Sequence, residues 1–123
     1  MSKAYDFIKE CGVFFVLTLN EGRPAGRPFG AIMEVGEHLY LATNDMNSVH
    51  HQLRQNGSMQ IIAKKADSRD WIRVSGTAAE CADEALRARI FEECPRLKVR
   101  YEGVDLKHFL LFEVTVEQVE YGN

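Results

Sequence analysis

Strand-sized apolar segments separated by turn residues follow one another along most of this 123-residue chain. The clearest segment, residues 13–19, is a run rich in Val and Phe, typical of a strand buried on both faces. The sequence Asn20-Glu21-Gly22 is a turn signal, so the next segment returns as the second strand of a hairpin. The predicted strands are residues 13–19, 25–35, 38–43, 59–64, 71–80 and 109–121.

Short helices are predicted before and between these strands. Each is marked by capping or breaking residues at its ends. The predicted helices are residues 2–10, ended by Gly12; a helix after the candidate caps Asn44, Asp45, Asn47 and Ser48 that ends near Gly57; and residues 83–94, capped by Asp83 and stopped by Pro95.

A small antiparallel β-barrel is the fold that this order of elements favours. The short connections imply antiparallel pairing, and six strands with short helices at the rims fit a closed or partly closed barrel. Side chains fill such a barrel, so a large ligand must sit on its outside or between two copies. No linker, repeat or low-complexity stretch divides residues 1–123, so we expect a single domain.

The composition is that of an ordinary globular protein. Hydrophobic residues make up 46% of the chain and charged residues 27%, which excludes wholesale disorder. The net charge is −3, from 15 basic and 18 acidic residues, and gives no reason to expect nucleic acid or an anionic membrane as a partner. A local basic site for a small anion stays compatible with this charge.

The cytoplasm is the location that we expect. The longest apolar run, residues 13–17, is only strand-sized, and the first ten residues lack the apolar core of a signal peptide. Cys11, Cys81 and Cys94 are odd in number and form no CxxC pair. Neither a disulfide framework nor a zinc site is therefore predicted.

Standard catalytic and nucleotide-binding motifs are absent from the sequence. It holds no GxSxG, no HExxH, no Walker loop and no GxGxxG after a strand. His50 and His51 are adjacent and would point about a hundred degrees apart on a helix. His38 and His108 are isolated, so we predict no metal site.

The first candidate ligand segment is Arg27-Pro28-Phe29-Gly30, within the second predicted strand. A proline in a strand implies an edge or an interrupted ladder. Arg27 can therefore point at something other than a neighbouring strand. Two interpretations remain open: an arginine that binds a ligand, or a solvated arginine beside a bulge.

The second candidate segment is TNDMNSVHHQL, residues 43–53. It places hydroxyls and amides at a strand end and a helix start, where free N–H groups and the helix dipole favour an anion. Plain helix capping uses the same residue types, so the local sequence does not decide between the two.

A third candidate is the pair Trp71 and Arg73, which are two residues apart on a predicted strand and so share a face. They could stack on a flat ligand. Alternatively, the arginine stem covers a half-buried tryptophan.

These segments together resemble the pyridoxamine 5'-phosphate oxidase-related family of FMN-binding split barrels. The stretch RPFGAIMEVGEHLYLATNDMNSVHHQL carries most of the resemblance, because its arginine, its LYLATN strand and its HQL helix have the family's order and spacing. The later WIRVSGTA is similar to the family's V-x-G-x-A strand. The resemblance, from about Val13 to Ala79, implies a six-stranded antiparallel split β-barrel with short flanking helices.

The resemblance also implies a homodimer that binds FMN in clefts between its subunits. Arg27 would contact the phosphate or ring-side groups, residues 28–32 would run along the isoalloxazine, and Trp71 would come from the opposite subunit. The implied cofactor-binding residues are Arg27, Pro28, Phe29, Gly30, Ala42, Thr43, Asn44, Asn47, Ser48, Val49, Gln52, Trp71 and Arg73.

The chain departs from the family pattern in two places. Many members have a basic pair where this chain has Ser48 and Val49, and we consider His50 or Lys64 as replacements. The substrate segment of the true oxidase, with its arginine and histidine, has no counterpart in HFLLFEVTVEQVEYGN. We therefore do not expect vitamin B6 oxidation; the short form is more similar to general-stress and nitroimidazole-resistance members.

The expected function is that of an FMN-dependent oxidoreductase that passes electrons from a nicotinamide to a small acceptor. Such a protein requires no acid or base of its own, because the flavin carries the redox chemistry. The alternatives are a non-catalytic flavin carrier or sensor, and a split barrel that binds haem, a deazaflavin or nothing.

Overall fold

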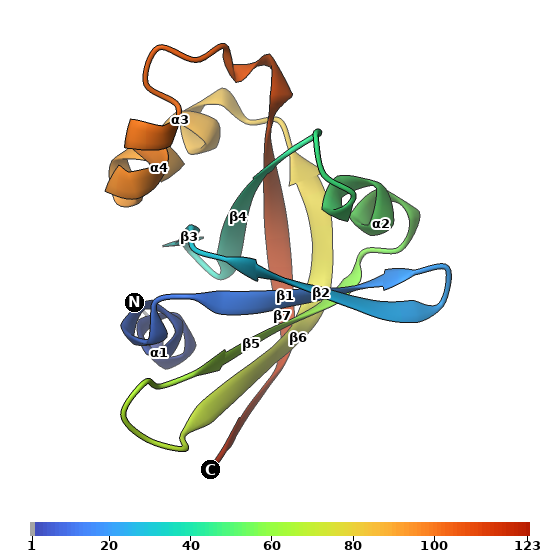
Figure 1. The fold of residues 1–123 in the computed structure, drawn as a ribbon, viewed down its shortest axis with the longest axis vertical. Coiled ribbons are helices and arrows are strands. Elements are labelled where there is room, and N and C mark those ends of the chain that lie inside the picture. Colours follow the sequence, from blue (N-terminus) through green and yellow to red (C-terminus); the bar gives the residue numbers. More distant parts are fainter. Residues whose placement is uncertain (1) are drawn as a thin grey trace.

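One antiparallel sheet of seven strands forms the body of the protein, as seen in the computed structural model, which describes residues 2–123 (Figure 1). In chain order the elements are α1 Lys3–Cys11, β1 Phe14–Asn20, β2 Arg23–Phe29, β3 Ile32–Val35, β4 His38–Asn44, α2 Val49–Gln55, β5 Ser58–Lys64, β6 Trp71–Cys81, α3 Glu84–Glu93, α4 Pro95–Arg100, the 3₁₀ helix η1 Leu106–His108 and β7 Phe109–Gly122. Hydrogen-bonded neighbours in the sheet follow the order β2-β1-β5-β6-β7-β4-β3.

The strands β2 and β3 are consecutive in the sequence but lie at opposite edges of the sheet. β2 pairs with β1, and β3 pairs with β4. Pro24 and Pro28 have no N–H to donate to a second neighbour, which confines β2 to an edge. Gly30 and Ala31 cross from one edge to the other, so the chain joins two edges that strand pairing leaves open.

This crossing corrects the predicted strand count. The sequence predicts one strand over residues 25–35 and six in all, whereas the structure has β2 and β3 there and seven in all. Apolar residues flank Gly30 on both sides, so the strand pattern runs through the break without a turn signal. The predicted mainly antiparallel β architecture with short flanking helices is confirmed.

The main core lies on the inner face of the sheet. β1 buries Phe14, Val16 and Thr18 in alternation, and leaves Phe15 49% exposed. The prediction that this strand is buried on both faces is therefore wrong. An antiparallel sheet can leave one face to solvent, and β1 alternates accordingly.

A second core cluster anchors the helices that follow β6. Ile90, Cys94 and Leu97 of this region pack with Phe109 and Leu111 of β7. Pro95 ends α3 as predicted, and it also occupies the first turn of α4, where its missing N–H costs nothing. The sequence analysis did not predict α4 or η1.

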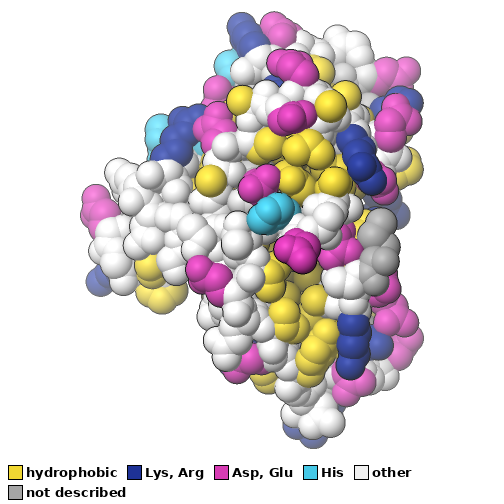
Figure 2. All heavy atoms as spheres, turned by 180° about the vertical axis from the view of Figure 1, so that it is seen from behind, with side chains coloured by type: hydrophobic (Ala, Val, Ile, Leu, Met, Phe, Trp, Pro, Cys, Tyr) yellow, Lys and Arg dark blue, Asp and Glu magenta, His cyan; other side chains and the backbone are white. Residues whose placement is uncertain are grey.

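The surface of the protein is mixed in character. Seen from behind, hydrophobic side chains form a band along the long axis with acidic and basic side chains beside it (Figure 2). Large apolar side chains that are exposed include Val13, Phe15, Val119 and Tyr121. Among residues 2–123, no helix is long and apolar enough to cross a bilayer.

A test of this packing is available where β6 and β7 meet at the bulge between Ser75 and Gly76. A Cβ added at Gly76 would overlap the backbone oxygen of Thr115. We expect Gly76→Ala to lower the free energy of unfolding by about 1–3 kcal/mol, measured by urea denaturation. Gly30→Ala is the matched control, since a Cβ there meets no atom within 4 Å; equal losses in both variants would contradict this contact.

Candidate functional site

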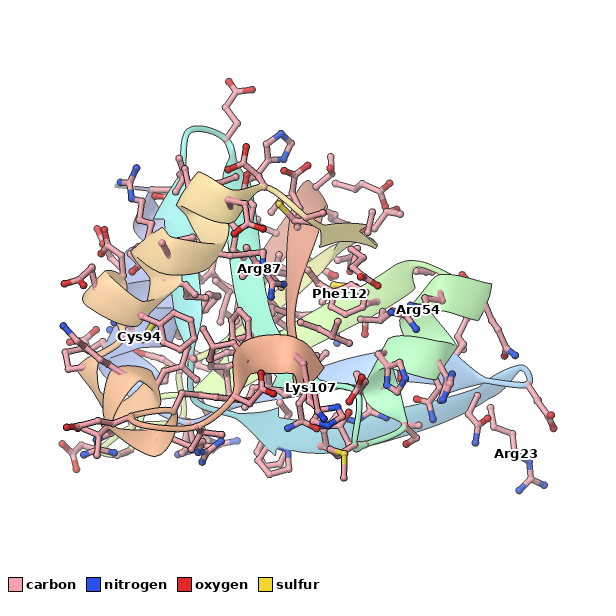
Figure 3. All side chains as sticks on the ribbon, turned by 90° about the horizontal axis from the view of Figure 1, so that it is seen from above. Arg23, Arg54, Arg87, Cys94, Lys107 and Phe112 are labelled. Carbon is pink, nitrogen blue, oxygen red and sulfur yellow. The ribbon has the colours of Figure 1, made fainter. Side chains whose placement is uncertain are left out.

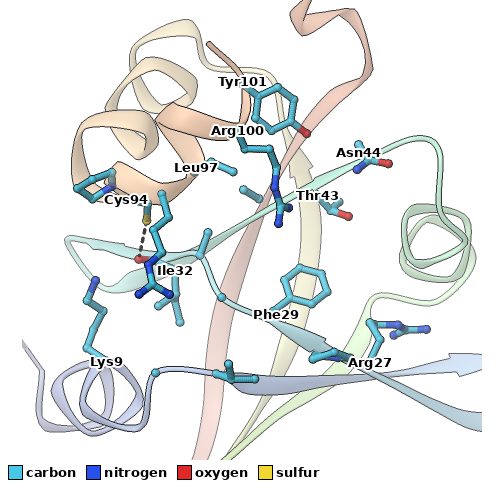
Figure 4. A pocket seen from close by; sticks show the side chains of 18 of the residues that line it. Lys9, Arg27, Phe29, Ile32, Thr43, Asn44, Cys94, Leu97, Arg100 and Tyr101 are labelled. Atoms are coloured by element: carbon cyan, nitrogen blue, oxygen red, sulfur yellow. Dashed lines mark hydrogen bonds between the residues drawn. The ribbon is translucent and has the colours of Figure 1, made fainter. Parts of the chain in front are cut away.

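A cavity of about 830 Å³ opens where the link between β2 and β3 passes beneath α4 (Figure 4). Its wall is completed by the end of α1 and the end of β4. Eight of the thirteen predicted site residues line it: Arg27, Pro28, Phe29, Gly30, Ala42, Thr43, Asn44 and Asn47.

The other five predicted site residues lie outside the lining. Val49 belongs to the main core, and Ser48 is exposed just before α2. Gln52 is 7% exposed and reaches the site only through Arg27. Trp71 and Arg73 stand on the outer face of β6, where Arg73 lies 5.2 Å from the Trp71 ring centroid and pairs with Glu120.

The guanidinium of Arg27 is held by neutral acceptors alone. One terminal nitrogen donates to Thr18 Oγ1 at 2.8 Å and to the Val16 carbonyl at 3.3 Å, and the other donates to Gln52 Oε1 at 2.7 Å. No carboxylate in residues 2–123 forms an ion pair with it. Burial lowers the pKa of Arg27 from its ordinary value, because the charged form is partly desolvated.

This geometry decides against the solvated arginine beside a bulge. The pairing of β1 with β2 runs without interruption from Phe14–Phe29 to Asn20–Arg23. Arg27 is half-buried and points toward α2 (Figure 4). The Arg27 guanidinium is therefore held in a fixed orientation against Thr18 and Gln52 at the cavity edge.

The polar residues at the end of β4 and before α2 make hydrogen bonds within this segment and also line the cavity. Asn47 donates to Thr43 Oγ1 at 3.1 Å and accepts from the Val49 N–H at 3.3 Å. Asn44 accepts from the Met46 N–H at 2.8 Å. Both amides thus accept from backbone N–H groups of this segment, but the N-cap of α2 is Ser48, whose side chain makes no capping hydrogen bond. Thr43 also lines the cavity.

The lining carries more positive charge than the sequence analysis predicted. Lys9 from α1 and Arg96 and Arg100 from α4 join Arg27, and no Asp or Glu of the described residues lines the cavity. Arg96 and Arg100 are four residues apart and so share a helical face. That spacing is visible in the sequence, but the signal was missed because no helix was predicted after Pro95.

The two residues considered as replacements for the missing basic pair do not line the cavity. His50 is 3% exposed, its Nδ1 has no hydrogen-bond partner within residues 2–123, and its ring stacks on His51 with centroids 3.9 Å apart. Lys64 donates to the Lys65 carbonyl at 2.9 Å. Besides Arg27, the cations that line the cavity come from α1 and α4.

Cys94 also lines the cavity, but as a structural thiol. It donates to the Ile32 carbonyl at 3.4 Å, and burial raises its pKa, so the neutral thiol is favoured over the reactive thiolate. No group of three or more potential metal ligands is found in the described part of the chain.

A sequence profile described as pyridoxamine 5'-phosphate oxidase matches residues 2–123. The chain belongs to the pyridoxamine 5'-phosphate oxidase family. A crystal structure of a NimC/NimA family protein from Clostridium acetobutylicum is 30% identical, with a TM-score of 0.84 over 97% of this chain and 88% of that one. The curated proteins gave no sequence match.

Two further structures share the fold of this family at lower identity. A FAD-binding protein from Mesorhizobium loti is 18% identical, with a TM-score of 0.74 over 98% of this chain and 94% of that one. The haem storage protein HutZ from Vibrio cholerae is 16% identical, with a TM-score of 0.78 over 98% and 91%. The family fold thus occurs in one protein described as FAD-binding and in another described as a haem storage protein.

The contacts beneath Arg27 generate a stability prediction. Gln52 accepts from both Arg27 and the buried Thr18 hydroxyl. We expect Gln52→Leu to lower the free energy of unfolding by about 1–3 kcal/mol, because these donors lose their acceptor. Gln55→Leu, on the same helix but exposed, is the matched control in urea denaturation. An unchanged stability of Gln52→Leu would argue against this network.

Proposed function

We propose that the protein binds FMN in the cavity between the β2–β3 link and α4. The observation that carries this proposal is the half-buried Arg27 guanidinium, which lines the cavity and has no carboxylate partner in residues 2–123. A charge of this kind is suited to a phosphate, since an arginine fork matches its oxygens. Thr43 would add a hydroxyl donor beside it.

The remaining lining suits a flat aromatic ligand. Pro28, Phe29 and Gly30 present a mostly apolar wall without charge, and Ala42 adds a small side chain. The volume of about 830 Å³ lies within the range of cofactor sites. The FAD-binding relative of the same fold is consistent with a flavin here.

Haem is the competing cofactor, because HutZ shares the fold. None of the four histidines lines the cavity, and the Cys94 thiol is occupied by the Ile32 carbonyl. Axial haem ligands are most often His, Cys, Met or Tyr side chains. Of these, only Tyr101 remains in the lining formed by residues 2–123, so the donor set favours the flavin.

We further propose that the protein is a homodimer joined through the outer face of β1, β5 and β6. Phe15 pairs with Pro28 on one side and Ile62 on the other, and Ile62 pairs with Arg73, so these side chains share that face. Pro28 also lines the cavity. A partner on this face would therefore reach the cavity edge, where its Trp71 could border the ligand.

The proposed activity is that of an oxidoreductase with a nicotinamide donor and a small acceptor. Bound FMN would supply the two-electron chemistry. The residues of this chain would bind phosphate, cover the ring and exclude water. Steady-state oxidation of NADH or NADPH by the FMN-loaded protein distinguishes an enzyme from a flavin carrier or sensor.

The cofactor proposal is tested by FMN titration, followed by flavin fluorescence and by absorption of the purified protein. We expect Arg27→Gln to weaken FMN binding about 10- to 100-fold, because a charge-assisted hydrogen bond contributes about 1.5–3 kcal/mol. Arg27→Lys should retain part of the affinity, since it keeps the charge.

The matched control is Arg23→Gln on the same strand. Arg23 is exposed at the tip of the β1–β2 hairpin, far from Cys94 and the cavity (Figure 3). Wild-type protein that takes up no FMN would refute the proposal. Equal affinities of Arg27→Gln and wild type would refute the phosphate assignment.

The dimer proposal is tested by light scattering after size-exclusion chromatography. We expect a dimer for the wild type and a monomer for Phe15→Asp, because a carboxylate would be buried against the partner. The side chain is 49% exposed in one chain, so folding itself should tolerate the change. Val99→Asp, at a residue 70% exposed on α4, is the control; a monomeric wild type would overturn the proposal.

A further inference from the structure

The link between α2 and β5 contains the only Asn-Gly dipeptide of the sequence, Asn56-Gly57 (Figure 1). Asn56 is exposed, and both residues lie outside the helix and the strand that they join. An asparagine followed by glycine is open to attack by the nitrogen of the next residue, because glycine has no Cβ to shield that nitrogen. The asparagines at 20, 44 and 47 are followed by Glu, Asp and Ser, which have side chains.

The local backbone folds the Asn56 side chain toward the nitrogen that would attack it. Asn56 Oδ1 accepts a hydrogen bond from the Ser58 N–H at 3.0 Å, which forms an Asx turn over the Gly57 peptide unit. This hydrogen bond also draws electron density away from the amide carbon, Cγ. The Gly57 N–H takes part in none of the hydrogen bonds found within residues 2–123, so its nitrogen is free to react.

Packing against β6 requires a glycine at position 57. A Cβ on Gly57 would lie 2.7 Å from the Ala78 carbonyl oxygen, closer than such atoms pack, and 3.1 Å from Thr77 Cγ2. A larger residue would therefore push the start of β5 away from β6. The fold thus retains a reactive dipeptide at this point because the link passes so close to the neighbouring strand.

We infer that Asn56 is a site of spontaneous deamidation, a modification for which water is the co-reactant. The Gly57 nitrogen loses its proton to the solvent and bonds to Asn56 Cγ, which closes a succinimide ring and releases the side-chain amide as ammonia. Water then opens the ring. Opening at Cγ gives aspartate, and opening at the main-chain carbonyl gives isoaspartate, in which the main chain is one carbon longer. Both products carry a new carboxylate.

The isoaspartate product alters the spacing between two fixed points of the backbone. The Asn56 N–H donates to the Gln52 carbonyl at 2.9 Å and closes the last turn of α2. The Gly57 carbonyl accepts from the Ala78 N–H at 2.8 Å, just before the β5–β6 ladder begins. The Gln52 side chain is in turn an acceptor for Arg27 at 2.7 Å. Modification of Asn56 therefore acts on the orientation of Arg27 through α2.

The modification is tested by incubating the full chain at mildly alkaline pH, followed by tryptic digestion and mass spectrometry, with fresh protein digested in parallel. Trypsin cleaves after Arg54 and Lys64, and the resulting peptide contains Asn56 as its one asparagine. We expect the mass of this peptide to rise by about one dalton, because OH replaces NH2. Methylation by an isoaspartyl methyltransferase identifies the isoaspartate fraction.

The free peptide QNGSMQIIAK, residues 55–64, gives the rate in an unstructured chain. We expect the folded protein to react on the same timescale, since Asn56 is exposed and the Gly57 N–H is unpaired within residues 2–123. Full conversion of the free peptide while the folded protein stays unmodified would overturn the inference. Equal modification at the asparagines at 20, 44 and 47 would overturn its assignment to this link.

Asn56→Ser is the control for the effect on α2, because serine keeps an oxygen acceptor and cannot form the succinimide. The isoaspartate form of the wild type is separated by anion exchange. We expect it to bind FMN about tenfold more weakly than fresh protein. Asn56→Ser should lose no affinity over the same incubation, and an equal loss in this variant would overturn the coupling to Arg27.

Only this coupling step rests on the proposed function. If fresh wild type binds no FMN, the proposed function fails, whereas the deamidation is decided by the peptide masses alone. The effect on α2 is then read from urea denaturation of the separated form. An isoaspartate form as stable as fresh protein would show that α2 tolerates the longer main chain, which refutes the coupling.

Discussion

The inability of β2 to pair on both sides is the constraint on which the rest of the structure depends. Pro24 and Pro28 remove two ladder donors, so β2 stays at an edge and hydrogen bonds only to β1. The following residues leave that edge and pair with β4 as β3. The barrel is therefore split along the line that Gly30 and Ala31 cross.

The cavity is a direct consequence of this split. Because no ladder closes the two edges, the β2–β3 link is exposed along a gap that α4 and the end of β4 border. From this edge strand Arg27 reaches Thr18 of the neighbouring strand β1 and Gln52 of α2, and these neutral acceptors fix its orientation without compensating its charge. The edge position of β2 thus places a cation of fixed orientation at the edge of the cavity.

Helix α4 supplies two of the basic residues that line the cavity, Arg96 and Arg100. It begins at Pro95, the residue that ends α3, and it is held down by Leu97 in the second core cluster. With Leu97 buried, Arg96 and Arg100 are brought to the cavity, and Lys98 is left to pair with Glu92 outside. Packing of Leu97 therefore decides which basic residues of the helix line the cavity.

The sequence by itself determined the antiparallel class, the positions of most strands and the choice between an edge and an interrupted ladder around Pro28, because alternation, turn residues and proline chemistry are local properties. Arg27, Thr43 and their neighbours could be selected from such patterns. Only the tertiary structure decided that residues 25–35 divide between the two edges of the sheet. The pairing of β2 with β1 and of β3 with β4 depends on contacts between strands, which the local sequence of residues 25–35 does not specify. It also decided that Lys9, Arg96 and Arg100 converge on one cavity while His50, Lys64, Trp71 and Arg73 do not line it. Residues so far apart in the chain meet only when the sheet has curled and α4 has packed on it.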